Sequence, residues 1–277
     1  MWMVRAGDRD GWLRDCREAA FASDGLVDFR RRPGVTLVTE TWLRDPERTK
    51  AATLYALTVM PRLRHWLHAV AEVDRVGGAY EDGAAEVRGH VLSGVAARSL
   101  MHAAQIERLF GRLDGFSVVE IGPGYGHLAA VLHALYSLSW YHACDLPDPT
   151  ALQQRYLSIQ AWRRPELYGK VTYEAMGDDG PGAPDLCLSA WSLSELDESG
   201  REAYADILRR SERWYHVWNE ADYGSDGESD SVEVGLAWLR SLDGDREVSR
   251  CDDGTFGIAP PCRTFSSNRV LVSRRTA

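Results

Sequence analysis

The sequence predicts an α/β protein of the doubly wound, Rossmann-like kind, with a mostly parallel seven-stranded sheet and a helical N-terminal region. From Phe116 onward, short apolar runs alternate with helix-like segments, and a glycine-rich turn follows the first of these runs. Right-handed crossovers bring the carboxyl ends of parallel strands to one edge of a sheet, where ligands bind. We therefore expect a helical region over residues 1–85 and a ligand-binding domain over residues 86–277.

The N-terminal region shows the three- and four-residue spacing of apolar side chains that is typical of amphipathic helices. These positions are Leu54, Leu57, Met60, Leu63, Trp66, Leu67 and Val70. Pro61 divides them into two helices, because proline lacks an N–H and its ring disfavours a helix interior. The stretch 77–83 is a linker by composition, and we expect a further helix over roughly residues 84–109.

The second part of the chain contains seven predicted strands and the helices that connect them. The strands are expected at 117–122, 140–145, 171–176, 185–191, 213–220, 246–251 and 268–274. The helices are expected at 127–136, 149–162, 198–211 and 232–242. The polar, acidic stretch 221–231 is expected to be a mobile loop or a lid.

Composition limits the classes of function. The net charge of −9 argues against a non-specific grip on nucleic acid or on an anionic membrane. Five cysteines without a CxxC pair indicate a reducing, cytoplasmic compartment and no structural zinc site; Cys144 and Cys187 are expected to be buried in strands. The sequence shows neither a signal-peptide core nor an apolar run of membrane-spanning length.

The glycine turn excludes a P-loop and disfavours a dinucleotide site. A P-loop needs Lys followed by Ser or Thr after its last glycine, whereas His127 and Leu128 follow Gly126. The dinucleotide fingerprint needs its third glycine at position 127. The spacing is instead G-x-G-x-G, at Gly122, Gly124 and Gly126, and an acid, Glu120, precedes it near the end of the strand.

In this respect the chain resembles class I S-adenosylmethionine-dependent methyltransferases, whose first motif is an acid followed by a G-x-G-x-G turn. The resemblance implies S-adenosylmethionine as cofactor. It implies that the glycine backbone lies against the methionine part, and that Asp145, which ends the next strand, binds the ribose hydroxyls. The full set of expected cofactor contacts is Glu120, Gly122, Pro123, Gly124, Tyr125, Gly126, Asp145, Leu146, Met176, Gly177, Ser189, Ala190 and Trp191.

Three further segments resemble the sugar O-methyltransferase family: 145–157, with Asp-Leu-Pro and then Leu-Gln-Gln, 185–196, with Ser-Glu, and 214–220, with Asn. The resemblance implies methyl transfer to a hydroxyl of a sugar or glycoside. A polyketide, phenolic or peptide acceptor is an alternative, and so is a non-catalytic scaffold that keeps the fold. The N-terminal helices are expected to act as a substrate cap or in homodimerisation.

Methyl transfer to an alcohol requires a general base, because the hydroxyl must lose its proton as the new C–O bond forms. Glu195 is the first candidate, since it lies just past the fourth strand; His127 is a second, and Asn219 is expected to orient the acceptor. Other candidates are Glu220, Asp197, His90 and His102. A metal is not required by any spacing, although Asp178, Asp179 and Asp185 could supply carboxylates.

Overall fold

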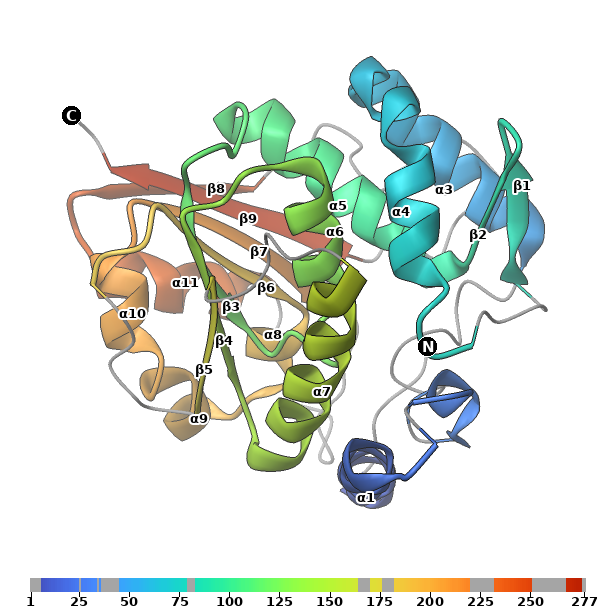
Figure 1. Cartoon of the computed structure of the whole chain (residues 1–277). Helices are drawn as coiled ribbons and strands as arrows, with labels where there is room; N and C mark the ends of the chain where they lie inside the picture. Colours follow the sequence, from blue (N-terminus) through green and yellow to red (C-terminus); the bar gives the residue numbers. More distant parts are fainter. Residues whose placement is uncertain are drawn as a thin grey trace.

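The structure of the chain is a computed structural model. The structure describes residues 6–24, 26–33, 35, 45–78, 83–163, 170–175, 182–219, 232–250 and 268–275. Its centre is a seven-stranded sheet with the order β5-β4-β3-β6-β7-β9-β8 (Figure 1). The strands are β3 (Ser117–Ile121), β4 (Trp140–Asp145), β5 (Val171–Ala175), β6 (Leu186–Ala190), β7 (Arg213–Asn219), β8 (Arg246–Arg250) and β9 (Asn268–Arg275).

The pairing confirms the predicted doubly wound sheet. Strands β3 to β7 are mutually parallel, and only β9 runs antiparallel to its neighbours β7 and β8. After β3 the chain moves outward through β4 and β5, and then returns to pair β6 on the other side of β3. The carboxyl ends of β3 and β6 therefore flank the point where the strand order reverses, which is where open α/β sheets bind ligands.

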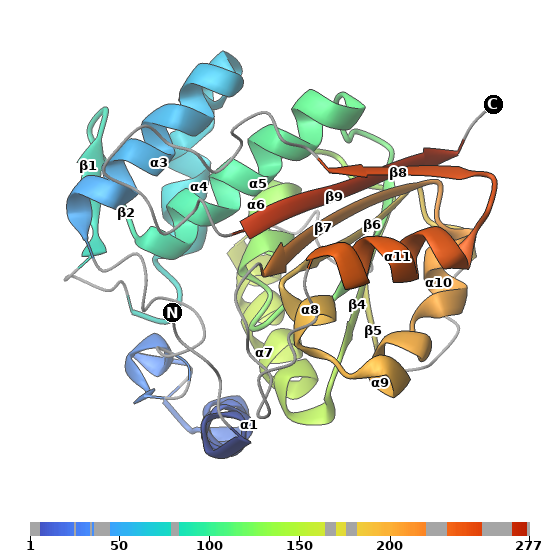
Figure 2. The ribbon, with the colours of Figure 1, turned by 180° about the vertical axis from the view of Figure 1, so that it is seen from behind.

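Helices cover both faces of the sheet (Figures 1 and 2). One face carries α5 (Gly94–Phe110), α6 (His127–Leu135) and α7 (Pro147–Arg163). The other carries α8 (Ser192–Glu195), α9 (Glu198–Glu202), α10 (Ala205–Arg210) and α11 (Val232–Leu242). Successive side chains of a strand point to opposite faces of the sheet, so each strand contributes to both cores. Val118 faces the core under α5–α7, whereas Val119 faces the core under α10 and α11. Cys144 and Cys187 are buried on this second face, as expected.

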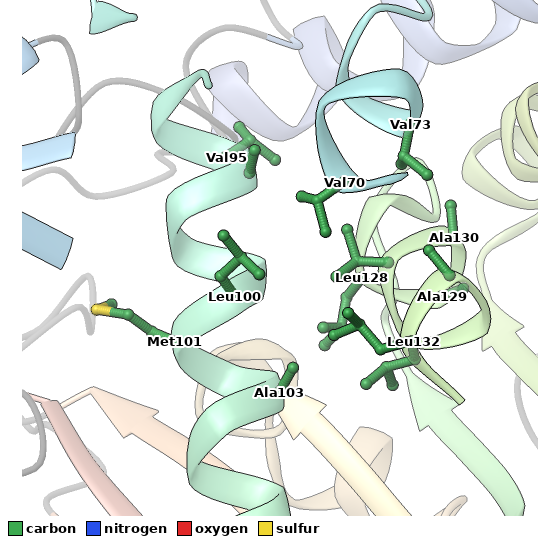
Figure 3. Close-up of a cluster of buried hydrophobic side chains, with 14 of the residues drawn as sticks. Val70, Val73, Val95, Leu100, Met101, Ala103, Leu128, Ala129, Ala130 and Leu132 are labelled. Atoms are coloured by element: carbon green, nitrogen blue, oxygen red, sulfur yellow. The ribbon is translucent and has the colours of Figure 1, made fainter. Parts of the chain in front are cut away.

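The N-terminal region packs on the first helical layer. It comprises α1 (Ala6–Phe21), η1 (Phe29–Arg31), α3 (Pro46–Val59), η2 (Pro61–His65) and α4 (Leu67–Asp74). Pro61 does separate two helices, as predicted. Helix α3 packs on α5, α4 on α6 and α1 on α7. Figure 3 shows Val70 and Val73 of α4 directed toward Leu128 and Ala130 of α6, within a core that continues into α5.

The prediction of one helix over residues 84–109 was wrong at its beginning. A hairpin of β1 (Ala85–Val87) and β2 (His90–Leu92) precedes α5. Its two-residue turn places Arg88 at φ 53° and Gly89 at φ 79°, the left-handed geometry that matches the twist of paired strands. Helix α5 then begins after Ser93, whose hydroxyl accepts a hydrogen bond from the N–H of Ala96 at 3.3 Å. The helix expected at 198–211 is likewise divided into α9 and α10.

Among the helices in the described parts of the chain, none combines the length and the apolar character needed to cross a bilayer.

Candidate functional site

The glycine turn lies between β3 and α6, at the reversal point of the sheet. All three glycines adopt the left-handed backbone region, with φ of 65° at Gly122, 62° at Gly124 and 89° at Gly126. An L-residue there would be strained by about 1–2 kcal/mol. The N–H of Gly122 donates to the carbonyl of Cys144 in β4 at 2.8 Å, and the N–H of Gly126 donates to the carbonyl of Pro123 at 3.0 Å.

The three glycines serve different purposes. A Cβ on Gly122 would overlap the hydroxyl of Ser192, which itself donates to the carbonyl of Gly122 at 3.0 Å. A Cβ on Gly126 would lie 3.2 Å from the side chain of Leu157 in α7. Around Gly124, by contrast, no described atom lies within 4 Å of the same point. Gly122 and Gly126 are therefore needed for packing, whereas the space beside Gly124 can admit a ligand.

Asp145 is tied to the glycine turn by Gln153. The side-chain amide of Gln153 donates to the carbonyl of Gly124 at 2.7 Å and to the Oδ2 of Asp145 at 2.9 Å. The N–H of Leu146 donates to the Oδ1 of Asp145 at 2.8 Å. Burial nevertheless raises the pKa of Asp145 to about 7, against the hydrogen bonds, which lower it. Gln153 was missing from the predicted site, although it belongs to the Leu-Gln-Gln piece of the sequence.

Glu120 lies on the buried face of β3. Only 2 % of the residue is exposed, and its carboxyl accepts a hydrogen bond from the hydroxyl of Tyr141 in β4. Burial and, to a smaller extent, the charge of Asp145 raise the pKa of Glu120 to about 8, although the hydrogen bond of Tyr141 and the charge of Arg98 oppose this rise. The motif acid is therefore largely protonated at neutral pH.

Trp191 follows β6 at the other side of the reversal point. Its φ of 74° makes it one of the few non-glycine residues in the left-handed region, where a bulky side chain is costly. Its N–H donates to the carbonyl of Val217 at 2.9 Å, which holds this conformation. The half-buried ring lies 5.2 Å from the guanidinium of Arg98 and 5.5 Å from the ring of His102.

The neighbours of Trp191 complete the end of β6. Ser189 is buried and its hydroxyl accepts from the N–H of Leu193 at 3.3 Å, while Ala190 is half-buried. His102 shares a hydrogen bond of 3.0 Å with the hydroxyl of Tyr215, and burial lowers the pKa of His102 to about 3. An imidazole held neutral in this way cannot be a cation at physiological pH.

Glu195 and Asp197 lie at the end of α8. Desolvation raises the pKa of Glu195 to about 7, although the residue keeps an exposed surface that water reaches. Asp197 instead caps α9, because its Oδ1 accepts from the N–H of Gly200 at 2.8 Å and from the hydroxyl of Ser199 at 2.9 Å. The carboxylate of Asp197 is therefore engaged as a helix cap, whereas Glu195 ends α8 with an exposed side chain.

His127 is the first residue of α6 and is almost completely buried. Its Nδ1 lies 2.9 Å from the hydroxyl of Ser99, and its Nε2 lies 3.5 Å from the Oδ1 of Asp74. Desolvation by burial lowers the pKa of His127 despite the nearby carboxylate. The side chain is directed into the N-terminal region, and its polar contacts are internal.

The other predicted residues lie elsewhere or outside the described chain. Met176, Gly177, Asp178, Asp179 and Glu220 are outside the described residues, and so is the stretch expected to form a lid. Asn219 ends β7, and its side chain is not described. His90 lies in the β1–β2 hairpin.

Asp185 does not belong to the glycine turn. Its carboxylate accepts hydrogen bonds from the N–H of Ser117 at 2.8 Å and from the hydroxyl of Ser117 at 2.6 Å, at the beginning of β3. This is the opposite edge of the sheet, so Asp185 cannot serve a ligand held at the turn. Within the described ranges, no group of three or more His, Cys, Asp or Glu side chains is arranged to hold a metal ion.

Comparison with known proteins gives similar folds only. No family model matches the chain, and no curated protein matches it. Among solved structures, the methyltransferase domain of a bacterial CtHen1 is 13% identical, with 63% of this chain and 97% of that chain covered and a TM-score of 0.47. The pyocyanin biosynthetic protein PhzM is 18% identical, with 66% and 57% covered and a TM-score of 0.45.

A third similar structure is the magnesium protoporphyrin IX methyltransferase ChlM from Synechocystis PCC 6803 with bound S-adenosylmethionine. It is 14% identical, with 64% of this chain and 81% of that chain covered and a TM-score of 0.43. Because these TM-scores lie below 0.5 and these identities below 25%, the likeness carries no argument about activity. Function must therefore be inferred from the residues of the site.

Proposed function

We propose that this protein is an S-adenosylmethionine-dependent O-methyltransferase that methylates a hydroxyl of a sugar or glycoside. The observation that carries the proposal is the joint geometry of the glycine turn and Asp145. Gly124 leaves open space at the reversal point of the sheet, and Gln153 links its carbonyl to the carboxylate at the end of the next strand. This geometry suits a ligand that has a ribose and a part lying against the turn.

The proposed cofactor fits the residues that are present. The backbone of Gly122–Gly126 would border the methionine part, and Asp145, when ionised, would accept hydrogen bonds from the two ribose hydroxyls. Leu146, Ser189, Ala190 and Trp191 would line the same edge, with Met176 and Gly177 proposed for the adenine. The cofactor supplies an activated methyl group, so much of the rate would come from positioning.

Glu195 is the proposed general base. Its carboxylate would take the proton of the acceptor hydroxyl as that oxygen attacks the methyl carbon. A pKa near 7 suits this role, because the group is substantially ionised at neutral pH and still basic enough to accept the proton. Asn219 is proposed to orient the acceptor. For His127 the internal contacts with Ser99 and Asp74 favour a positioning role over catalysis.

A flat acceptor is a second candidate, because one aromatic ring at this edge of the sheet can accommodate it as well as a sugar. The half-buried ring of Trp191 lies directly past β6 with the guanidinium of Arg98 at 5.2 Å. An aromatic face of this kind can stack on a sugar ring or on a planar phenolic or polyketide group. The N-terminal region would then cap the acceptor. A cytoplasmic location would fit the buried thiols of Cys16 and Cys187.

The test is methyl transfer from radiolabelled S-adenosylmethionine to a panel of acceptors. The panel contains nucleotide sugars and glycosides in one arm, and phenolic, polyketide and peptide natural products in the other. Labelled product in the sugar arm supports the proposal. Labelled product in the second arm alone would show that the acceptor is a phenolic, polyketide or peptide compound instead. If the cofactor binds and no arm gives product, the protein is a scaffold rather than an enzyme.

A further inference from the structure

The glycine turn contacts the N-terminal region directly, through a tyrosine inside the turn. Tyr125, between Gly124 and Gly126, is only 2 % exposed. Its ring meets the ring of Phe29 edge-on, with the centroids 5.1 Å apart and an interplanar angle of 84°. Tyr156 of α7 makes a contact of the same distance and angle on Tyr125. Edge-to-face pairs of this kind fix ring orientation as well as contributing buried area.

Phe29 has little room to move away from Tyr125. A Cβ on Gly77 would overlap the ring of Phe29, and the N–H of Arg30 donates to the carbonyl of Gly77 at 3.2 Å. The stretch 77–83, expected to be a linker by composition, therefore begins with a residue packed against η1. Phe29 therefore contacts both the backbone of Gly77 and the ring of Tyr125 in the turn.

A buried polar network makes the second connection. The guanidinium of Arg30, fully buried, donates to the Oδ1 of Asp74 at 3.0 Å, to the carbonyl of Asp74 at 2.8 Å and to the hydroxyl of Ser93 at 2.7 Å. Asp74 also accepts from the N–H and the hydroxyl of Ser93, each at 2.7 Å. The same Oδ1 of Asp74 lies 3.5 Å from the Nε2 of His127, the residue that directly follows the glycine turn.

The charges of this network are balanced internally. Burial opposes the ionisation of Asp74, but Arg30, the nearby imidazole of His127 and the hydrogen bonds of Ser93 hold the pKa of Asp74 well below its usual range. Breaking a buried ion pair on one side leaves an uncompensated charge, so the network tolerates little rearrangement. It therefore fixes the first turn of α6 relative to α4 and the beginning of α5, where Figure 3 also shows continuous apolar packing.

We infer that Arg30 and Phe29 are positioning residues of the cofactor site, and that the N-terminal region forms one functional unit with the glycine turn. In this arrangement η1 holds Tyr125 and His127, and through them the backbone that would border the methionine part of the cofactor. The N-terminal region would then do more than cap the substrate, because cofactor affinity would depend on residues that precede the sheet in the chain. The inference rests on the proposed function in one respect only, which is that its binding experiment uses a ligand of the proposed cofactor site.

The test compares Arg30→Met with Arg246→Met, a matched change at a second buried arginine. Arg246 donates to the carbonyl of Ser211 at 2.6 Å and to the carbonyl of Glu212 at 3.0 Å. These contacts lie at the amino end of β7, whereas the glycine turn lies at the carboxyl edge of the sheet. Both variants are expected to lower the Tm. Only Arg30→Met is expected to weaken S-adenosylhomocysteine binding, by about tenfold, the size of coupling that such networks carry. Arg30→Lys, which keeps the charge, should recover part of this loss.

Hydrogen exchange of the peptide that spans residues 118–132 gives a readout without any ligand. Exchange should become faster in Arg30→Met and stay unchanged in Arg246→Met. Each variant is measured at a temperature that lies the same number of degrees below its own Tm. If Arg30→Met fails to fold, His127→Gln replaces it with the same expectation. Equal effects of the two arginine variants on affinity and exchange would overturn the inference. If the wild-type protein binds no S-adenosylhomocysteine, the proposed function fails, while the exchange comparison still decides the inference.

Discussion

Three carboxyl groups at the carboxyl edge of the sheet have pKa values that desolvation raises toward neutrality: Glu120, Asp145 and Glu195. Raised acids concentrated in one place are typical of functional sites, although buried structural acids show the same shift. The three carboxyl groups differ in their surroundings. Glu120 is enclosed and hydrogen-bonded by Tyr141, Asp145 is held by backbone and Gln153, and Glu195 remains accessible to water.

We predict that Glu195→Gln lowers kcat by about 100-fold or more, because a positioned general base contributes roughly that much. Cofactor affinity should stay within about twofold of wild type, since the glutamine keeps the shape of the side chain. In the wild type, kcat should rise with pH through about 7, as Glu195 loses its proton. Steady-state kinetics from pH 5.5 to 8.5 check both points, and a variant with full activity and the same pH profile would remove Glu195 from this role.

Glu120 should produce a pH dependence of stability. Between the ordinary pKa of 4.5 and the raised pKa of about 8, the unfolded chain carries an ionised carboxylate, whereas the folded protein keeps the proton. Stability therefore falls as pH rises through this window. We predict that Glu120→Gln, which retains an acceptor for Tyr141, loses part of this slope. Urea unfolding at several pH values measures it, and identical slopes in the two proteins would contradict the raised pKa.

The elements of the sheet could be predicted well from sequence, because apolar runs of strand length alternate with helix-length segments. All seven strands lie where they were expected, within a few residues. The hairpin before α5 was missed because Ala85–Leu92 is short and is followed directly by a helical pattern. The left-handed Trp191 was missed for a different reason: its conformation depends on its hydrogen bond to Val217 in β7, which is far away in sequence.

The glycine turn permits a comparison between two glycines with nearly equal φ. Gly122→Ala should lower the free energy of unfolding by about 3 kcal/mol, combining left-handed strain with overlap against Ser192. Gly124→Ala, with φ of 62° and no described neighbour within 4 Å, should cost only the strain, about 1–2 kcal/mol. In a Ser192→Gly background the extra cost at Gly122 should shrink. Additive effects of Gly122→Ala and Ser192→Gly would show that the overlap has no energetic role.

In the whole molecule, one apolar core contains residues from both the predicted N-terminal helical region and the predicted ligand-binding domain. Periodicity identifies helices but not the surfaces on which they pack. The contacts of Phe29 with Tyr125 and of Asp74 with His127 join residues about 50 or more positions apart, and no local pattern could indicate them.

The central claim is that the glycine turn binds S-adenosylmethionine, and calorimetric titration with S-adenosylhomocysteine tests it most directly. The wild type should bind with a Kd below about 100 μM. Gly124→Trp should abolish binding by filling the space beside the turn, while its far-UV circular dichroism stays native. Affinity should also rise with pH through about 7, as Asp145 ionises. No binding by the wild type, or unchanged affinity in Gly124→Trp, would contradict the claim.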